Sequence, residues 1–97
     1  MLKTVNKSTK NDFLIKFGKH IKQLRKARGL SQSELAERCR SNIKKIGRTE
    51  RGEYDFKISS LIVLAKGLDL SIPELLNFEY PENLFENFWI EDNIFQE

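Results

Sequence analysis

Residues 31–50 read SQSELAERCRSNIKKIGRTE, and this stretch decides the fold. Ser31 is followed three residues later by Glu34, which is the spacing of a capping box. In that motif the hydroxyl and the carboxylate each satisfy a backbone N–H at a helix start. Residues 40–41 then leave room only for a tight turn before Asn42, which can cap a second helix. The stretch therefore predicts two short helices joined by a tight turn, the second over about 42–49.

Longer amphipathic helices are predicted on both sides of this pair. Over 11–28, apolar residues recur at three- and four-residue steps, and Gly29 is placed to end that helix in the left-handed conformation. Ser71 and Glu74 repeat the capping box and open a short helix over about 72–77. A helix over about 57–68 is expected to bury six apolar residues, namely Ile58, Leu61, Ile62, Leu64, Ala65 and Leu68. No stretch alternates with period two, so the prediction is an all-α domain of five helices.

The bulk properties fit one small domain with tails. The chain has 97 residues and no apolar run near the roughly 20 that a membrane helix needs. Its first residues do not resemble a secretory signal, so a cytoplasmic location without membrane contact is expected. We expect a flexible basic arm over 1–10, the folded domain over 11–78 and an acidic aromatic tail over 79–97.

The chemistry of the chain does not favour catalysis. Cys39 is the only cysteine, which excludes an internal disulfide and a cysteine-based metal cluster. Its side chain is expected to be a small buried hydrophobic group. His20 is the only histidine and is expected to be a surface side chain among lysines. Since no nucleophile set, paired-carboxylate cleft or phosphate loop is found, we expect no enzyme, no cofactor and no metal.

Charge is distributed unevenly along the chain. Residues 1–57 carry 16 Lys and Arg against 6 Asp and Glu, whereas residues 79–97 carry 6 acidic residues and no basic ones. A stretch rich in Lys and Arg is typical of proteins that bind phosphate groups. Charged stretches nevertheless more often form a solvent-exposed face.

Several motifs together resemble the Xre/Cro family of phage-repressor-like regulators, over roughly residues 12–77. They are IKQLRKARGLSQ at 21–32, ELA at 34–36, IGR at 46–48, ERGE at 50–53, LAK at 64–66 and SIPEL at 71–75. The resemblance implies a five-helix, all-α, phage-repressor-like helix-turn-helix domain. Residues 79–97 lie outside this domain and are expected to add a short helical C-terminal extension. It further implies a transcriptional regulator that binds double-stranded operator DNA, as a homodimer on a pseudo-palindrome.

The resemblance also assigns roles to single residues. The predicted second helix of the pair supplies the base contacts Ile43, Lys44 and Arg48. Lysine and arginine can donate to guanine, and an isoleucine can meet a thymine methyl. Ser31, Gln32 and Lys45 are assigned to phosphates, and for Lys45 a solvated surface position is an equally good interpretation.

A further pair of residues is assigned to structure. The resemblance implies that Arg25 and Glu50 form a largely buried ion pair, for which the bidentate geometry of arginine is well suited.

Three positions depart from the family pattern. Arg40 stands where Gly is common, Thr49 where Ile or Leu is usual, and Gly47 lies inside the predicted reading helix.

The tail leaves three interpretations open. Leu84, Phe85, Phe88 and Trp89 would share one face of a helix opened by Pro81. That face could pack on its own domain, form a dimer interface or bind another protein. The last possibility supports an alternative function, an antitoxin-like or adaptor module whose acidic aromatic tail holds a protein partner.

Overall fold

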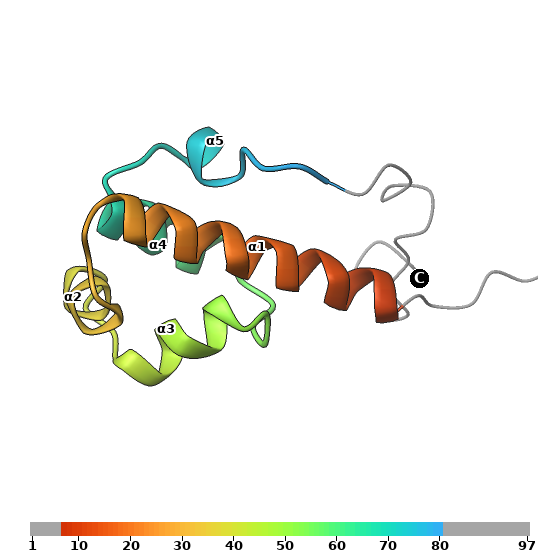
Figure 1. The fold of residues 1–97 in the computed structure, drawn as a ribbon, viewed down its shortest axis with the longest axis horizontal. Coiled ribbons are helices and arrows are strands. Elements are labelled where there is room, and N and C mark those ends of the chain that lie inside the picture. Colours follow the sequence, from red (N-terminus) through yellow and green to blue (C-terminus); the bar gives the residue numbers. More distant parts are fainter. Residues whose placement is uncertain (1–6, 81–97) are drawn as a thin grey trace, which may run out of the picture.

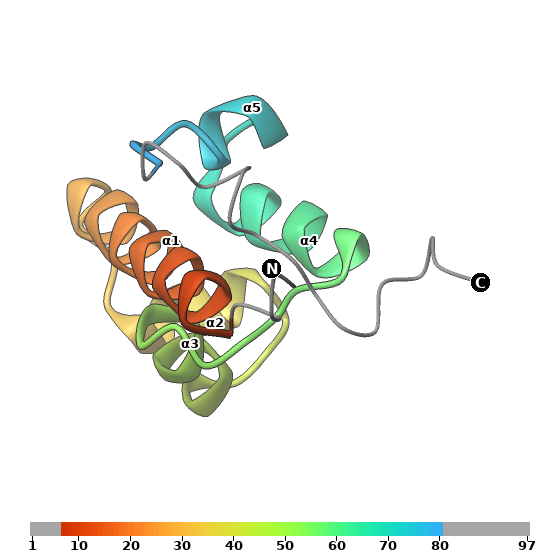
Figure 2. The ribbon, with the colours of Figure 1, turned by 90° about the vertical axis from the view of Figure 1, so that its right-hand side faces the viewer.

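The computed structural model describes residues 7–80, which form five helices and no strand. These are α1 (Lys7–Ala27), α2 (Gln32–Arg38), α3 (Ile43–Glu50), α4 (Ile58–Leu68) and α5 (Ile72–Leu75). The long α1 spans the domain, with α2 and α3 packed near one side of it and α4 and α5 on another (Figures 1 and 2). The predicted all-α fold is confirmed.

The helix ends follow the signals in the sequence. In the first capping box the Ser31 amide donates to Glu34 Oε1 at 2.7 Å, and the Glu34 amide donates to Ser31 Oγ at 3.0 Å. The second box, at Ser71 and Glu74, has the same two bonds. Gly29 follows α1 with φ of 69°, which only glycine adopts without cost.

The hydrophobic core receives side chains from all five helices. Its fully buried side chains come from four helices and are Ile21, Leu35, Leu68 and Leu75. Cys39 is also buried, as expected of a small hydrophobe. The close packing of these helices sets the position of α3 relative to the rest of the domain.

The contact between α1 and α3 depends on a glycine that the sequence argument did not single out. A Cβ on Gly18 would lie 2.5 Å from the carbonyl oxygen of Thr49 and 2.6 Å from that of Glu50. Real Cβ atoms do not approach backbone oxygens so closely, and therefore only glycine lets the two helices touch here.

Several predicted boundaries and burials need correction. Helix α1 begins at Lys7, so 7–10 belong to the helix and not to an arm, and α5 ends at Leu75. Ile58 and Ile62 were expected in the core, yet they are 75% and 46% exposed. Helical spacing identifies an apolar stripe, but α4 turns only part of its stripe toward α1 and α2. No helix within 7–80 is long and apolar enough to cross a membrane.

Candidate nucleic-acid interface

Helix α3 has two faces with different environments. Ile46, Thr49 and Glu50 are buried against the domain, while Ile43 is 54% exposed and both lysines that follow it are exposed. Asn42 fixes where the helix begins, because its Oδ1 accepts a hydrogen bond from the Lys45 amide at 2.9 Å. The first turn of α3 therefore presents its side chains to solvent while the rest of the helix holds it in place.

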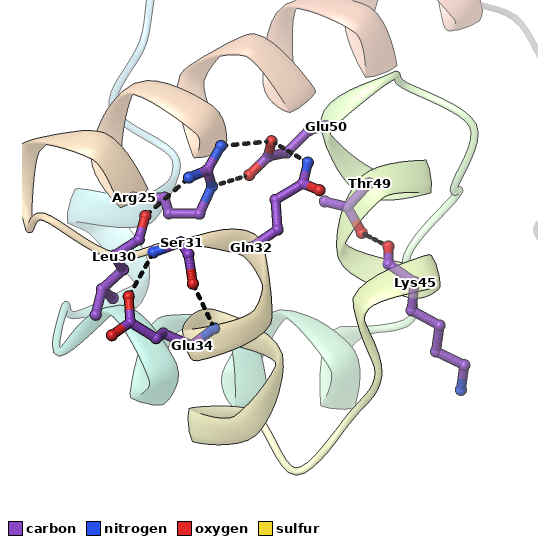
Figure 3. A network of polar contacts seen from close by, with 8 residues as sticks. All are labelled: Arg25, Leu30, Ser31, Gln32, Glu34, Lys45, Thr49 and Glu50. Carbon is purple, nitrogen blue, oxygen red and sulfur yellow. Dashed lines mark hydrogen bonds and ion pairs between the residues drawn. The ribbon is translucent and has the colours of Figure 1, made fainter.

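The end of α3 is tied to α1 by a buried polar network (Figure 3). Arg25 Nε donates to Glu50 Oε2 at 2.6 Å, and Arg25 Nη2 donates to Glu50 Oε1 at 3.1 Å. The third donor of this arginine, Nη1, bonds the Leu30 carbonyl at 2.8 Å. The predicted ion pair is thus present, and its bidentate geometry fixes the direction of α3 relative to α1.

Gln32 adds a third helix to this network. Its side-chain amide donates to Glu50 Oε1 at 2.9 Å. The carboxylate of Glu50 therefore receives donors from α1 and from α2 at once. All three helices of this half of the domain meet at one buried charge.

Arg48 lies one turn beyond the exposed start of α3 and has partners of its own. Its guanidinium carbon is 5.0 Å from the centre of the Tyr54 ring, and its Nε is 3.7 Å from Glu53 Oε1. The side chain remains 44% exposed. These contacts, which the sequence argument missed, point to a guanidinium that is positioned by an aromatic face.

Glu53 sits between two arginines at the end of α3. The hydrogen bond from Arg51 lowers the pKa of Glu53, and the charges of Arg51 and Arg48 lower it further. This carboxylate therefore offsets part of the positive charge of α3.

The three departures from the family pattern each have a local explanation. Arg40 adopts φ of 53°, so the turn takes the left-handed conformation without a glycine. The Thr49 hydroxyl donates to the Lys45 carbonyl at 2.8 Å, which satisfies it inside the helix. Gly47 is buried beneath a side chain, since a Cβ there would lie 3.1 Å from Nη1 of Arg51.

A family model described as a helix-turn-helix domain matches residues 16–78. The chain belongs to this helix-turn-helix family. The Xre/Cro resemblance is confirmed, and with it the function of a DNA-binding transcriptional regulator.

Several solved and curated relatives of this helix-turn-helix chain are controller proteins. Control protein C.SmaI of Serratia marcescens is 40% identical over 57 residues, which cover 59% of this chain and 68% of the relative. The restriction-modification controller protein C.AhdI of Aeromonas hydrophila is 35% identical with a TM-score of 0.65, over 67% of this chain and 98% of that one. The controller protein C.Esp1396I is 28% identical with a TM-score of 0.60, over 76% and 90% of the two chains.

Within the helix-turn-helix unit, α2 is the first helix and α3 the second. The predicted base-contact residues Ile43 and Lys44 lie on the exposed first turn of α3, and Lys45 points away from the packed helices (Figure 3). Ser31 and Gln32 lie at the start of α2, where their polar groups already serve the capping box and Glu50. The structure gathers Ile43, Lys44 and Lys45 on one turn and places Arg48 beside Tyr54.

Other predicted features fall elsewhere. Leu84, Phe85, Phe88 and Trp89 lie outside the described residues. Among residues 7–80, no three His, Cys, Asp or Glu side chains gather as metal ligands would. His20 is half-buried and not a free surface side chain, because its ring lies 5.1 Å from the ring of Phe78.

Proposed function

We propose that this regulator reads operator DNA in the major groove with α3. Ile43, Lys44 and Arg48 would contact base edges, and Lys45, Ser31 and Gln32 would contact phosphates. One observation carries the proposal: the first turn of α3 is exposed and cationic, while the same helix is held at its other end by the buried Arg25–Glu50 pair. A reading helix needs both an accessible first turn and a fixed orientation.

The start of α2 supports a role at the phosphate backbone. In a helix-turn-helix unit the first helix crosses the backbone while the second enters the groove. Since Gln32 donates to Glu50, a phosphate contact by α2 would be transmitted directly to the carboxylate that orients α3. The two helices would then dock on DNA as one unit.

We propose that the functional form is a homodimer built on α4. Ile58 is 75% exposed and Ile62, one turn further along the helix, is 46% exposed. Two large apolar side chains on one helix face favour burial against a second copy of the same face. A two-fold dimer would bind half-sites about 10 base pairs apart, or a multiple of that distance.

The relatives support a proposal for the class of genes controlled. C.AhdI and C.Esp1396I are restriction-modification controller proteins, and we propose the same class of target for this chain. Its operator would then lie in the promoter region of a restriction-modification gene pair.

The decisive experiment selects bound sequences from a random DNA pool with the full chain. A regulator is expected to yield a two-fold symmetric consensus, bound more tightly than random DNA by about 10³-fold or more. Weak binding without sequence preference would overturn the reading role and favour the adaptor function. Dimerisation is tested with Ile62→Glu, which is expected to give a folded monomer in sedimentation, with Lys66→Glu on the same helix as the control.

A further inference from the structure

A cavity of about 470 Å³ lies between α3, α4 and residues 54–57. Its wall is apolar where Ile46, Phe56 and Leu64 line it. Cavities that bury ligands fall in the range of about 300–1,000 Å³ and combine an apolar wall with a few polar groups. This cavity falls within that size range, and its lining combines apolar and polar groups.

Three of the four charged residues that line the cavity are cations. Arg40, Lys45 and Lys57 line it, together with a single acidic residue, Asp55. The Asp55 carboxylate is paired with Lys10 at 3.0 Å, so its charge is already partly compensated. An occupant that matches these surroundings is apolar and carries negative charge.

Residues 81–97 of this chain have that composition. The segment contains five carboxylates and no Lys or Arg. Its four aromatic residues are Phe85, Phe88, Trp89 and Phe95. No other stretch of the sequence combines aromatic side chains with negative charge in this way.

A series of ring contacts connects the end of the described chain with the cavity wall. The ring of Tyr80 lies 4.6 Å from that of Phe78, which lies 6.0 Å from Phe17, and Phe17 lies 5.5 Å from Phe56 in the cavity wall. Because Phe17 is buried, the segment cannot follow this series directly and must pass over the surface of the domain. In extended conformation the 17 residues of 81–97 span about 56 Å, which is ample length to reach the cavity.

We propose that the cavity binds segment 81–97 of the same chain. The aromatic side chains of the segment, Phe85 and Trp89 among them, pack against Ile46, Phe56 and Leu64, and its carboxylates meet Lys45 and the neighbouring cations. Attachment at residue 80 gives the segment a high effective concentration at the cavity compared with a separate molecule. The inference does not depend on which DNA the domain binds.

Trp89 is the only tryptophan and reports the state of the segment directly. Val63 lines the cavity and is 43% exposed, whereas Lys66, one turn further along α4, is exposed and does not line it. In the full chain, Val63→Glu is expected to shift Trp89 emission to longer wavelength, and Lys66→Glu is expected to leave it unchanged. Unchanged emission in Val63→Glu, or an equal shift in both variants, would overturn the proposal.

Two further measurements refine this test. The first asks whether ion pairing contributes to binding of the segment, and the second asks whether the segment binds within its own chain or to a second copy. Val63→Lys is expected to shift the emission less than Val63→Glu, because lysine attracts an acidic segment; an equal shift would count against the proposed ion pairing. Dilution below the dimer dissociation range is expected to leave the emission of the unaltered protein constant. A shift to longer wavelength on dilution would assign the cavity to the segment of a second copy and overturn binding within one chain.

A separate test is needed if circular dichroism shows that Val63→Glu does not fold. This test changes the segment and measures the reactivity of a cavity residue. Cys39 lines the cavity and is the only thiol. Phe85→Ser, which changes no residue within 7–80, is expected to make Cys39 react several-fold faster with an aromatic disulfide reagent. An unchanged rate would overturn the proposal.

Discussion

Arg25 of α1 and Glu50 of α3 form a bidentate ion pair whose side chains are only 8% and 4% exposed. Arg25→Ala would leave the Glu50 carboxylate buried without its charge partner, which typically costs about 3–5 kcal/mol. We expect a correspondingly lower free energy of unfolding in urea. Lys26→Ala, next along α1 and exposed, is the control and should change stability by less than about 0.5 kcal/mol. Equal unfolding curves for both variants would contradict a structural role for the pair.

The contact at Gly18 should be as sensitive as a core position. In Gly18→Ala the added methyl group meets two backbone carbonyls of α3, and overpacking of this kind costs about 1–3 kcal/mol or more. Gly29→Ala is the matched variant, because Gly29 has open space around it and only its positive φ opposes the change. Thermal unfolding should rank Gly18→Ala as the less stable of the two. The opposite ranking would mean that α1 and α3 can separate without cost.

The two lysines at the start of α3 should differ in how they support DNA binding. Lys44→Ala is expected to weaken the selected site by about 1–3 kcal/mol and to reduce preference at one base pair. Lys45→Ala should weaken selected and random DNA alike and lower the slope of log K against log salt by about 1. Salt titrations of both variants, with Lys66→Ala as control, measure the affinity for each DNA and its dependence on salt. The same loss on both DNAs for Lys44→Ala would exclude it from base contact.

Glu53 should limit the affinity of α3 for DNA. Its carboxylate lies 3.7 Å from Arg48 Nε and 3.0 Å from Arg51 Nε, so Glu53→Gln frees both cations for a polyanion. We expect affinity for DNA to rise a few-fold at low salt and the gain to shrink as salt screens the charges. Glu37→Gln on α2 changes the net charge equally. If it raised affinity as much, the effect would be one of overall charge.

The capping boxes should make the domain sensitive to acid. The hydrogen bond from the Ser31 backbone, aided by its hydroxyl, lowers the pKa of Glu34 below 4.5, and Ser71 does the same to the pKa of Glu74. A carboxylate with a lowered pKa in the folded state stabilises the protein above its unfolded pKa, and this is lost as pH falls through the folded value. Urea midpoints should therefore drop below pH 4.5. The drop should be smaller in Glu34→Gln, which keeps an acceptor but cannot titrate.

Local sequence signals predicted the helix ends well because capping is a short-range interaction. Ser31, Asn42 and Ser71 each cap the helix that the sequence assigns to them, and Gly29 ends α1. The start of α1 at Lys7 was missed, because the apolar spacing on which the prediction rested begins only near residue 11. In α4, helical spacing could not separate side chains that face the core from Ile58 and Ile62, which do not.

Long-range contacts were less accessible to sequence reasoning. Arg25 and Glu50 are 25 residues apart, and only the family resemblance connected them. The stacking of Arg48 on Tyr54 and the bond from Gln32 to Glu50 had no local signal. Gly18 did have a local signal. A glycine inside a long amphipathic helix lowers helix stability by about 1 kcal/mol unless close packing requires it.

The division of α3 into an exposed first turn and a buried remainder has a consequence for how such regulators diverge. Substitutions at residues 43–45 touch no core side chain, nor the Arg25–Glu50 pair or the Gly18 contact. Under the proposed reading role, new operator preferences would therefore arise by single mutations that leave folding intact. A cell would then acquire a regulator with a different target while retaining the same scaffold, and two such copies would coexist without reading each other's sites.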